Sequence, residues 1–336
     1  MPSKIELIEF YLPENVVTNE DLTKIRANWQ PEKIEEKIGV RQRHVCAKNE
    51  TGLDLAEKAC EKLFENNEYD KSKIDFLILC TQSPDYFLPT TACLLQSRLK
   101  LRVNIGAFDY NLGCSGYIYG LGIASGLIEA SIAENILLVT SETYSKHLHN
   151  NDIALRSIFG DAASATIVSK CDWNGIKKIV FGTDGRMDYA NNLIVKNGGM
   201  RNPYNENAET YTDESGNQYT DNNLYMNGPG IFNFTIQTVP SLIYTTLEKN
   251  NLKLEDVDHF VFHQANKYML NYLRKKLKIS EEKFYIDLYD TGNTVSSSIP
   301  IALKNCISKK IVQKGAKVLI CGFGVGYSWG ATIVEI

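Results

Sequence analysis

The stretch KIDFLILCTQSP at residues 73–84 decides the fold, because DVDHFVFHQAN at residues 256–266 repeats its pattern. Each stretch has an acidic residue near its start, continues as an apolar run and ends in polar residues. A short apolar run bounded by turn residues is typical of a buried strand. The sequence therefore contains a similar strand unit twice.

Two further pairs of segments repeat in the same order. The first pair is AENILLVTSE at 133–142 and GAKVLICGF at 315–323. The second pair is IFGDAASATIV at 158–168 and FGVGYSWGATIV at 323–334. Convergent strand patterns could produce one such pair by chance, but three pairs in one order indicate an internal duplication. We predict two similar halves.

Strand-like and helix-like segments alternate, which predicts an α/β fold. The predicted strands are 75–80, 104–110, 135–140, 164–168, 257–262, 317–321 and 331–335. The predicted helices are 51–67, 90–100, 115–130, 231–250, 267–278 and 298–312. The duplication predicts an N-terminal half at 1–172 and a C-terminal half at 173–336. Residues 183–228 break the pattern, and their tyrosines with Met200 and Met226 favour an ordered loop.

The composition argues against several classes of protein. A net charge of −4 is mildly acidic and argues against nucleic acid as the main partner, because that would need a strong basic field. No apolar run approaches about 18 residues, so no membrane span is expected. The start, MPSKIELIEF, has no signal-peptide pattern, and we expect the cytoplasm. The eight cysteines show no zinc spacing, and the pair His147 and His149 lacks further ligands, so no metal site is expected.

Cys114 lies in NLGCSG at residues 111–116, between a predicted strand and a helix rich in small residues. Glycines on both sides of Cys114 permit a tight turn that presents its side chain outward. The turn also places the thiol at a helix N-terminus, where the partial positive charge favours a thiolate. The alternative is a buried cysteine in a packing helix. This segment alone does not decide between a nucleophile and a core thiol.

His263 and Asn293 are two further candidates. His263, in FHQAN at 262–266, follows a predicted strand, and ligands bind at the C-terminal ends of strands in open α/β sheets. The duplication places this strand opposite residues 73–84, which favours a functional histidine over a structural one. Asn293, in TGNTVSSS at 291–298, could equally be a turn or cap residue.

The closing segment GFGVGYSWG at 322–330 contains GxGxG after a predicted strand. No helix follows it, so a dinucleotide site is a poor fit. A Gly-rich turn that offers backbone N–H groups to a developing oxyanion fits better.

Together these segments resemble the ketoacyl synthase III group of the thiolase superfamily, over essentially the whole chain. The resemblance rests on Gly113-Cys114-Ser115-Gly116, His263-Gln264-Ala265-Asn266, Gly292-Asn293, FGVGYSWG at 323–330, GVRQRH at 39–44 and FGD at 159–161. It implies a five-layered αβαβα thiolase fold made of two duplicated halves, usually as a homodimer. The active-site trio of the family then falls on Cys114, His263 and Asn293.

The resemblance also implies a reaction, a decarboxylative Claisen condensation. An acyl group carried by Cys114 would condense with a malonyl thioester, malonyl-acyl carrier protein, to give a 3-oxoacyl thioester in fatty acid biosynthesis. His263 and Asn293 would donate hydrogen bonds to the enolate. The N–H groups of Cys114 and Val325 would form the oxyanion hole, and Phe323 would shield the carbanion. No cofactor is expected beyond the CoA or phosphopantetheine that carries each thioester.

The family uses an acidic acyl carrier protein, so a basic docking surface is expected. The residues after His263 that suit this role are Lys267, Arg274, Lys275 and Lys278. The alternative for these residues is an ordinary solvated helix face.

This chain also departs from the family pattern around the donor site. Relatives that use acetyl-CoA commonly have a Trp before the Gly-x-Arg-x-Arg segment and an Arg before the Phe-Gly-Asp turn. Here Lys33 stands at the Trp position, Arg156 lies too close to the Phe-Gly-Asp turn, and Tyr268 replaces an Arg. The acyl group and its carrier, acyl-CoA or another acyl thioester, therefore stay open.

Rival activities of the same fold fit the sequence less well. A thiolase would need a second cysteine, but Cys321 lies ahead of the Gly-rich turn and Asn293 stands where a thiolase has His. Hydroxymethylglutaryl-CoA synthase needs a Glu where Gln82 stands. Non-decarboxylating acyltransferases tend to carry Asp in place of Asn293. A non-catalytic partner subunit would usually have lost Cys114.

Overall fold

The computed structural model describes residues 2–24 and 29–336, and its two largest sheets share one topology. The strand order is β1-β7-β6-β4-β5 in the first sheet and β8-β16-β15-β13-β14 in the second. Each sheet is antiparallel at its first two junctions and parallel at its last two. This correspondence confirms the duplication, because β4, β6 and β7 match β13, β15 and β16 in the order that the sequence repeats predict.

The strands of the two sheets have the following bounds. The first sheet consists of β1 (Ser3–Tyr11), β4 (Phe76–Cys80), β5 (Gly106–Tyr110), β6 (Asn135–Glu142) and β7 (Ala162–Lys170). The second consists of β8 (Val180–Thr183), β13 (His259–Phe262), β14 (Phe284–Tyr285), β15 (Lys317–Gly324) and β16 (Ser328–Glu335).

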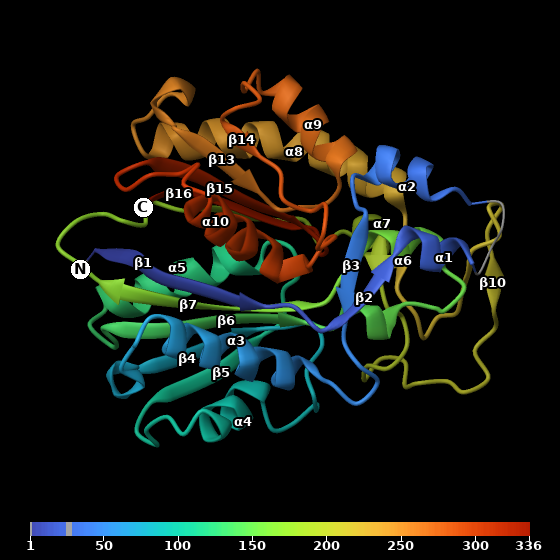
Figure 1. Cartoon of the computed structure of the whole chain (residues 1–336), viewed down its shortest axis with the longest axis horizontal. Helices are drawn as coiled ribbons and strands as arrows, with labels where there is room; N and C mark the ends of the chain where they lie inside the picture. Colours follow the sequence, from blue (N-terminus) through green and yellow to red (C-terminus); the bar gives the residue numbers. More distant parts are fainter. Residues whose placement is uncertain (1, 25–28) are drawn as a thin grey trace.

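Helices fill three layers around the two sheets (Figure 1). The central layer holds α5 (Gly116–Glu129) and α10 (Ser298–Ser308), and the outer layers hold α3 (Gly52–Asn66) with α4 (Thr91–Arg98) and α8 (Gly228–Lys249) with α9 (Lys267–Lys276). The predicted five-layered αβαβα thiolase fold is therefore confirmed.

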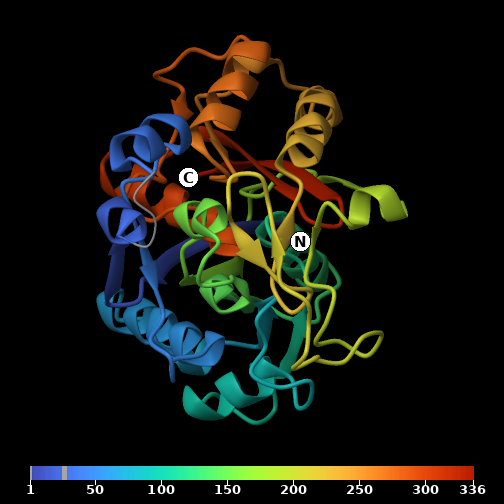
Figure 2. The same cartoon turned by 90° about the vertical axis from the view of Figure 1, so that its right-hand side faces the viewer.

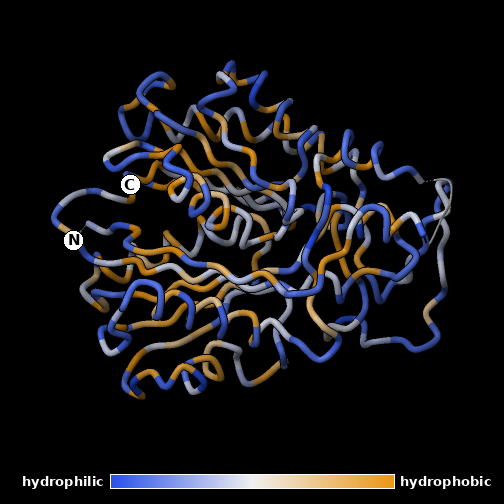
Figure 3. The backbone as a smooth tube through the Cα atoms, in the orientation of Figure 1, coloured by the Kyte–Doolittle hydropathy of each residue, from blue (hydrophilic) through white to orange (hydrophobic). Residues whose placement is uncertain are grey.

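The central layer packs against both sheets through apolar side chains. Leu121 of α5 and Leu303 of α10 belong to one buried cluster that also includes Ile78 of the first sheet and Ile320 of the second. In Figure 3, orange apolar segments follow the sheets and blue polar segments lie outside them. Burial of this shared core joins the two halves along their whole length.

The shorter elements gather at one end of the molecule, on the right in Figure 1 and facing the viewer in Figure 2. They are α1 (Asn19–Thr23), α2 (Pro31–Ile38), α6 (Ile153–Ile158), α7 (Met187–Ala190), β2 (Asn15–Thr18), β3 (Gln42–Val45), β9 (Leu193–Ile194), β10 (Tyr211–Thr212), β11 (Gln218–Tyr219) and β12 (Tyr225–Met226). Single 3-10 turns occur at η1 (Lys71–Lys73), η2 (Tyr144–His147), η3 (Leu254–Asp256) and η4 (Val295–Ser297). Strand pairs β9–β12 and β10–β11 order the segment 183–228, as the sequence predicted. None of the helices in the described ranges is long and apolar enough to cross a membrane.

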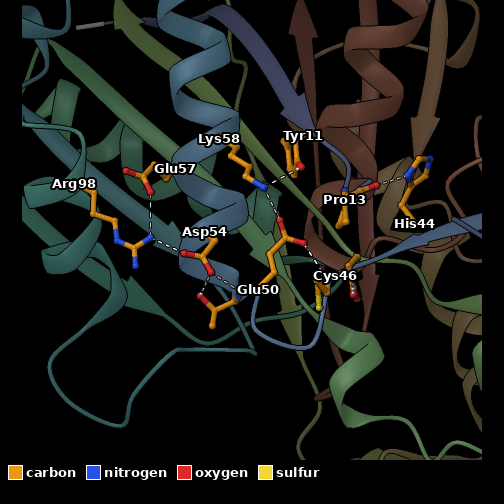
Figure 4. Close-up of polar contacts among 12 residues, drawn as sticks. Tyr11, Pro13, His44, Cys46, Glu50, Asp54, Glu57, Lys58 and Arg98 are labelled. Atoms are coloured by element: carbon orange, nitrogen blue, oxygen red, sulfur yellow. Dashed lines mark hydrogen bonds and ion pairs between the residues drawn. The ribbon is translucent and has the colours of Figure 1, made fainter. Parts of the chain in front are cut away.

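Polar contacts fix α3 and the segment before it (Figure 4). Arg98 bridges Asp54 and Glu57, at 2.6 and 3.1 Å, and Lys58 contacts Glu50 at 2.7 Å. Partly exposed ion pairs of this kind contribute about 0–1 kcal/mol each. Their role is to locate the segment that leads from β3 to α3, in which the Cys46 N–H donates to Asp161.

Candidate active site

Cys114 lies on a tight turn between β5 and α5, as the sequence predicted, and only 6% of it is exposed. The turn needs glycine at Gly113, where a Cβ would lie 2.6 Å from Gln82 Oε1 and 2.7 Å from Val325 Cγ1. It is also pressed against β15, because a Cβ on Gly324 would lie 2.8 Å from Cys114 Sγ. Cys114 is therefore held between the two halves.

Burial and the nearby Glu142 carboxylate raise the pKa of Cys114 to about 12. The backbone N–H groups of Cys114 and Val325 act in the opposite direction. The sequence analysis expected the helix N-terminus to favour a thiolate, but burial outweighs that effect, so the resting side chain is a thiol. The same two N–H groups face the sulfur, where an oxyanion hole needs its donors.

His263 directly follows β13 and is 2% exposed. Burial lowers the pKa of its imidazole to about 3, although the Val295 carbonyl acts in the opposite direction, so the ring is neutral near pH 7. Nδ1 lies 2.7 Å from Ser298 Oγ, and the ring meets that of Phe323 edge-on at 5.7 Å between centroids. With Nδ1 engaged, Nε2 is the nitrogen available to a substrate.

Asn293 is 5% exposed and is held through its backbone and its side chain. Its N–H donates to Ile158 O at 2.8 Å, and its carbonyl accepts from Gly160 N–H at 3.0 Å. Its Oδ1 accepts from Val295 N–H at 2.9 Å. Because the oxygen of the amide is engaged, the Nδ2 donor is left for the cavity.

The Phe-Gly-Asp segment 159–161 braces Asn293. Gly160 has no space for a side chain, since a Cβ would overlap Thr291 O, and Gly292 beside Asn293 has a φ of +66°. Asp161 is fully buried, and it accepts hydrogen bonds from the N–H groups of Cys46 and Ser145, both at 2.8 Å. The segment thus joins a catalytic candidate of the C-terminal half to the backbone of the N-terminal half.

One cavity of about 80 Å³ is lined by Cys114, His263 and Asn293 together. Its other walls are Tyr144, Ile158, Phe159, Leu193, Met226, Gly228, Ile231, Ala265, Asn266, Met269, Phe323 and Gly324. Leu193 and Met226 come from the segment 183–228, so this insertion forms part of the site. Three residues from separate loops thus meet in one mainly apolar cavity.

Sequence reasoning missed two buried polar groups beside this cavity. Glu142 is fully buried at the end of β6, where Ser296 Oγ donates to it at 2.7 Å and Gln82 N–H at 3.0 Å. Burial raises the pKa of Glu142 to about 8. Ser298 is the other missed group. Neither has a local sequence signal, because each acts through a contact with a distant segment.

The predicted docking residues divide between two surfaces. Lys267 and Lys275 line an open groove of about 630 Å³ together with Lys33 and Lys37 of α2, which sequence reasoning missed. Asn266 and Met269 line the catalytic cavity, so the first turn of α9 separates the cavity from this groove.

The other two docking residues lie elsewhere. Arg274 does not line the groove: its side chain is only 15% exposed and contacts Glu281 at 3.6 Å. Lys278 is exposed beyond the end of α9. The groove therefore includes two of the four residues that the sequence analysis selected.

The described parts of the chain contain no group of three His, Cys, Asp or Glu side chains that could hold a metal ion. Two duplicated sheets with cysteine, histidine and asparagine meeting between them define a protein of the thiolase superfamily.

Comparison with known proteins specifies the family. The profile of 3-oxoacyl-[acyl-carrier-protein] synthase III matches residues 108–185, and that of its C-terminal part matches residues 247–336. A β-ketoacyl-[acyl-carrier-protein] synthase III of Clostridium acetobutylicum is 34% identical over 97% of this chain and 96% of its own. One of Fusobacterium nucleatum is 35% identical over 97% and 96%. The chain belongs to the 3-oxoacyl-[acyl-carrier-protein] synthase III family.

Solved structures agree with this assignment. A crystal structure of a 3-oxoacyl-(acyl-carrier-protein) synthase III is 45% identical, covers all of both chains and has a TM-score of 0.97. A 3-oxoacyl-(acyl-carrier protein) synthase from Burkholderia xenovorans is 32% identical, with a TM-score of 0.91 over 100% of this chain and 94% of its own.

Proposed function

We propose that this enzyme joins an acyl group, held as a thioester on Cys114, to the two-carbon unit that malonyl-acyl carrier protein releases on decarboxylation, giving a 3-oxoacyl thioester. The single observation that carries the proposal is the shared cavity of Cys114, His263 and Asn293, in which a thiol meets a neutral imidazole and an amide N–H donor. The pathway is fatty acid biosynthesis, as the family name implies.

Acyl transfer is the first step. The sulfur of Cys114 attacks the carbonyl carbon of the donor thioester, and the donor leaves as a free thiol that carries the proton lost by Cys114. The raised pKa of Cys114 means that the thiolate forms only as this exchange proceeds. The N–H groups of Cys114 and Val325 stabilise the tetrahedral oxyanion, and such a donor contributes about 3 kcal/mol.

Decarboxylation and condensation follow. The malonyl carbon–carbon bond breaks, carbon dioxide leaves, and its electron pair becomes an enolate. His263 Nε2 and Asn293 Nδ2 donate hydrogen bonds to the enolate oxygen. The enolate carbon attacks the acyl carbon, and Cys114 leaves as a thiolate that takes up one proton from solvent, the proton that the overall condensation consumes. Phe323 forms the wall beside His263 that excludes water from the carbanion.

The lysine groove suits an acidic carrier protein. Its charged lining is four lysines, Lys33, Lys37, Lys267 and Lys275, against one carboxylate, Glu36, so the groove is net positive. The groove and the cavity lie on two sides of the first turn of α9, so a carrier protein docked in the groove would bring its phosphopantetheine arm beside the cavity. The acyl donor is CoA or a carrier protein. Lys33 and Tyr268 replace residues that are common in relatives that use acetyl-CoA, so these positions do not select CoA.

A homodimer completes the proposal. β5 is an edge strand of the first sheet with one unpaired side, and all five of its residues are only partly buried. Near the end of neighbouring β4, the loop residues Tyr86, Phe87 and Leu88 are 60%, 72% and 81% exposed. An unpaired strand edge beside exposed apolar residues is typical of a surface that a second copy covers. We expect the protein in the cytoplasm, without a metal or redox cofactor.

Intact-protein mass spectrometry tests the reaction. The enzyme is incubated with a panel of acyl-CoA and acyl-carrier thioesters, and we expect one acyl mass on Cys114 and none on Cys114→Ala. Adding malonyl-acyl carrier protein should then release carbon dioxide and remove the label. Equal labelling of Cys114→Ala would refute the nucleophile, and turnover without carbon dioxide would favour the thiolase or non-decarboxylating alternatives.

Charge reversal tests the groove. We expect Lys267→Glu with Lys275→Glu to raise the KM for the carrier-protein substrate about tenfold or more, and to leave a small thioester surrogate unaffected. Lys73→Glu is the matched control, because η1 precedes β4 whereas Cys114 follows the parallel β5, so the two lie at opposite ends of these strands. Equal effects on both substrates would show that the groove does not dock a carrier.

A further inference from the structure

Three consecutive serines run from η4 into the start of α10, and their hydroxyl groups reach two places, strand β6 and the residue that follows β13. Ser296 Oγ lies 2.7 Å from Glu142 Oε1, Ser297 Oγ lies 2.8 Å from Thr140 Oγ1, and Ser298 Oγ lies 2.7 Å from His263 Nδ1. None of the three serines is more than 2% exposed. The first two hydroxyls bind the N-terminal half, whereas Ser298 alone contacts a catalytic candidate.

The hydrogen of the Ser298 hydroxyl can be placed from its surroundings. Ser298 Oγ accepts the backbone N–H of Gln264 at 3.3 Å, which uses one lone pair. A buried hydroxyl also needs an acceptor for its own hydrogen. Among the hydrogen bonds of the described residues, His263 Nδ1 is the one acceptor within reach of that hydrogen. Ser298 therefore donates to Nδ1.

The hydrogen of the His263 ring follows from this bond. A neutral imidazole has one N–H, and an Nδ1 that accepts a hydrogen bond carries none. Burial keeps the ring neutral near pH 7, as described above. The ring hydrogen is thus on Nε2, the nitrogen that does not contact Ser298.

We propose that Ser298 is a positioning residue that selects the Nε2–H form of His263 and thereby serves decarboxylation rather than acyl transfer. The proposal rests on the function proposed above. In the other form, an Nε2 lone pair would face the negative oxygen of the enolate and repel it. The acylation of Cys114 uses other donors, the N–H groups of Cys114 and Val325, so it does not depend on this choice.

Single-turnover kinetics on full-length Ser298→Ala separate the two steps. We expect carbon dioxide release from malonyl-acyl carrier protein to fall about 10- to 100-fold, with the rate of Cys114 acylation within about twofold of the natural enzyme. Ser297→Ala is the matched control, because it removes a neighbouring buried hydroxyl that does not touch His263. An equal loss in both steps, or an equal effect of Ser297→Ala on decarboxylation, would overturn the proposal.

Nitrogen NMR of the natural enzyme provides an independent readout that a merely structural serine would not move. With ¹⁵N-labelled histidine, and the His263 signals identified by their loss in His263→Gln, we expect protonated Nε2 and unprotonated Nδ1 near pH 7. A protonated Nδ1 would overturn the proposal even if Ser298→Ala failed to fold. The failure of acyl labelling on Cys114 would instead refute the proposed function and leave the NMR result standing.

Discussion

Replacing Gly324 by alanine should damage acyl transfer through a steric clash with the nucleophile. The new Cβ would lie 2.8 Å from both Cβ and Sγ of Cys114. Non-bonded carbon atoms prefer about 3.5–4.0 Å, so Cys114 or β15 would have to move by roughly 0.7 Å or more. The oxyanion donor of Val325 follows Gly324 in the chain and would move with it.

The size of the effect follows from the two consequences of this overlap. Overpacking of a buried site costs about 1–3 kcal/mol in the free energy of unfolding, which urea titration measures. A displacement approaching 1 Å between reacting groups can slow a reaction about 100-fold, so we expect acylation of Cys114 to slow about 10- to 100-fold in rapid-quench mass spectrometry.

Gly126→Ala provides the matched control for the same chemical change. Gly126 lies in α5, where an added Cβ would have no other atom within 4 Å. Alanine should stabilise the helix there by about 0.5–1 kcal/mol and leave acylation unchanged. If Gly324→Ala acylates at the natural rate and gains stability as Gly126→Ala does, the reasoning about the contact between β15 and Cys114 is wrong.

Three further predictions concern the polar groups of the site. Asn293→Ala should stop decarboxylation and also lose about 1–3 kcal/mol of stability, because the buried Val295 N–H loses its acceptor. Asn293→Asp keeps that acceptor, so it should stop carbon dioxide release with a smaller loss of stability in urea titration. Equal stability losses in the two variants would contradict the assigned orientation of the Asn293 amide. The pKa of Glu142 is raised from its ordinary 4.5 to about 8. Between these two pH values the folded state holds a proton that the unfolded state has lost. The stabilisation of the folded state that this proton gives is complete below pH 4.5 and is lost as pH rises through about 8. The unfolding free energy of the natural enzyme should therefore fall relative to Glu142→Gln between pH 5 and pH 9, and parallel curves would refute a buried, protonated Glu142. Alkylation of Cys114 by iodoacetamide should rise about tenfold per pH unit from pH 7 to 9, because its pKa is raised to about 12, and a plateau in that range would contradict the resting thiol.

The sequence was sufficient for the architecture because the duplication leaves a repeated strand pattern. All seven predicted strands exist, six of them in the repeats, although their ends shift by up to three residues. β1 was missed because three of its nine residues are charged, which hides the apolar pattern of an edge strand. β14 was missed because two residues are too few for a pattern to show.

The sequence predicted only those site residues whose neighbours in the chain form a recognisable pattern. Cys114 between glycines and His263 after a strand can be found on the chain, but Ser298 and Glu142 act through partners that are distant in sequence. Lys267 and Lys275 lie eight residues apart in α9, so two helical turns place them on one face. Arg274 follows the buried Leu270 by four residues, and that spacing could have shown that it faces inward.

The cavity volume of about 80 Å³ has a consequence for how tightly decarboxylation is coupled to carbon–carbon bond formation. A cavity of this size has room for at most a few water molecules, and the reacting groups displace them when they bind. An enolate formed there meets the acyl carbon far more often than a proton from solvent. The enzyme should therefore form close to one new carbon–carbon bond for each carbon dioxide released, and little malonyl thioester should be diverted to an acetyl thioester.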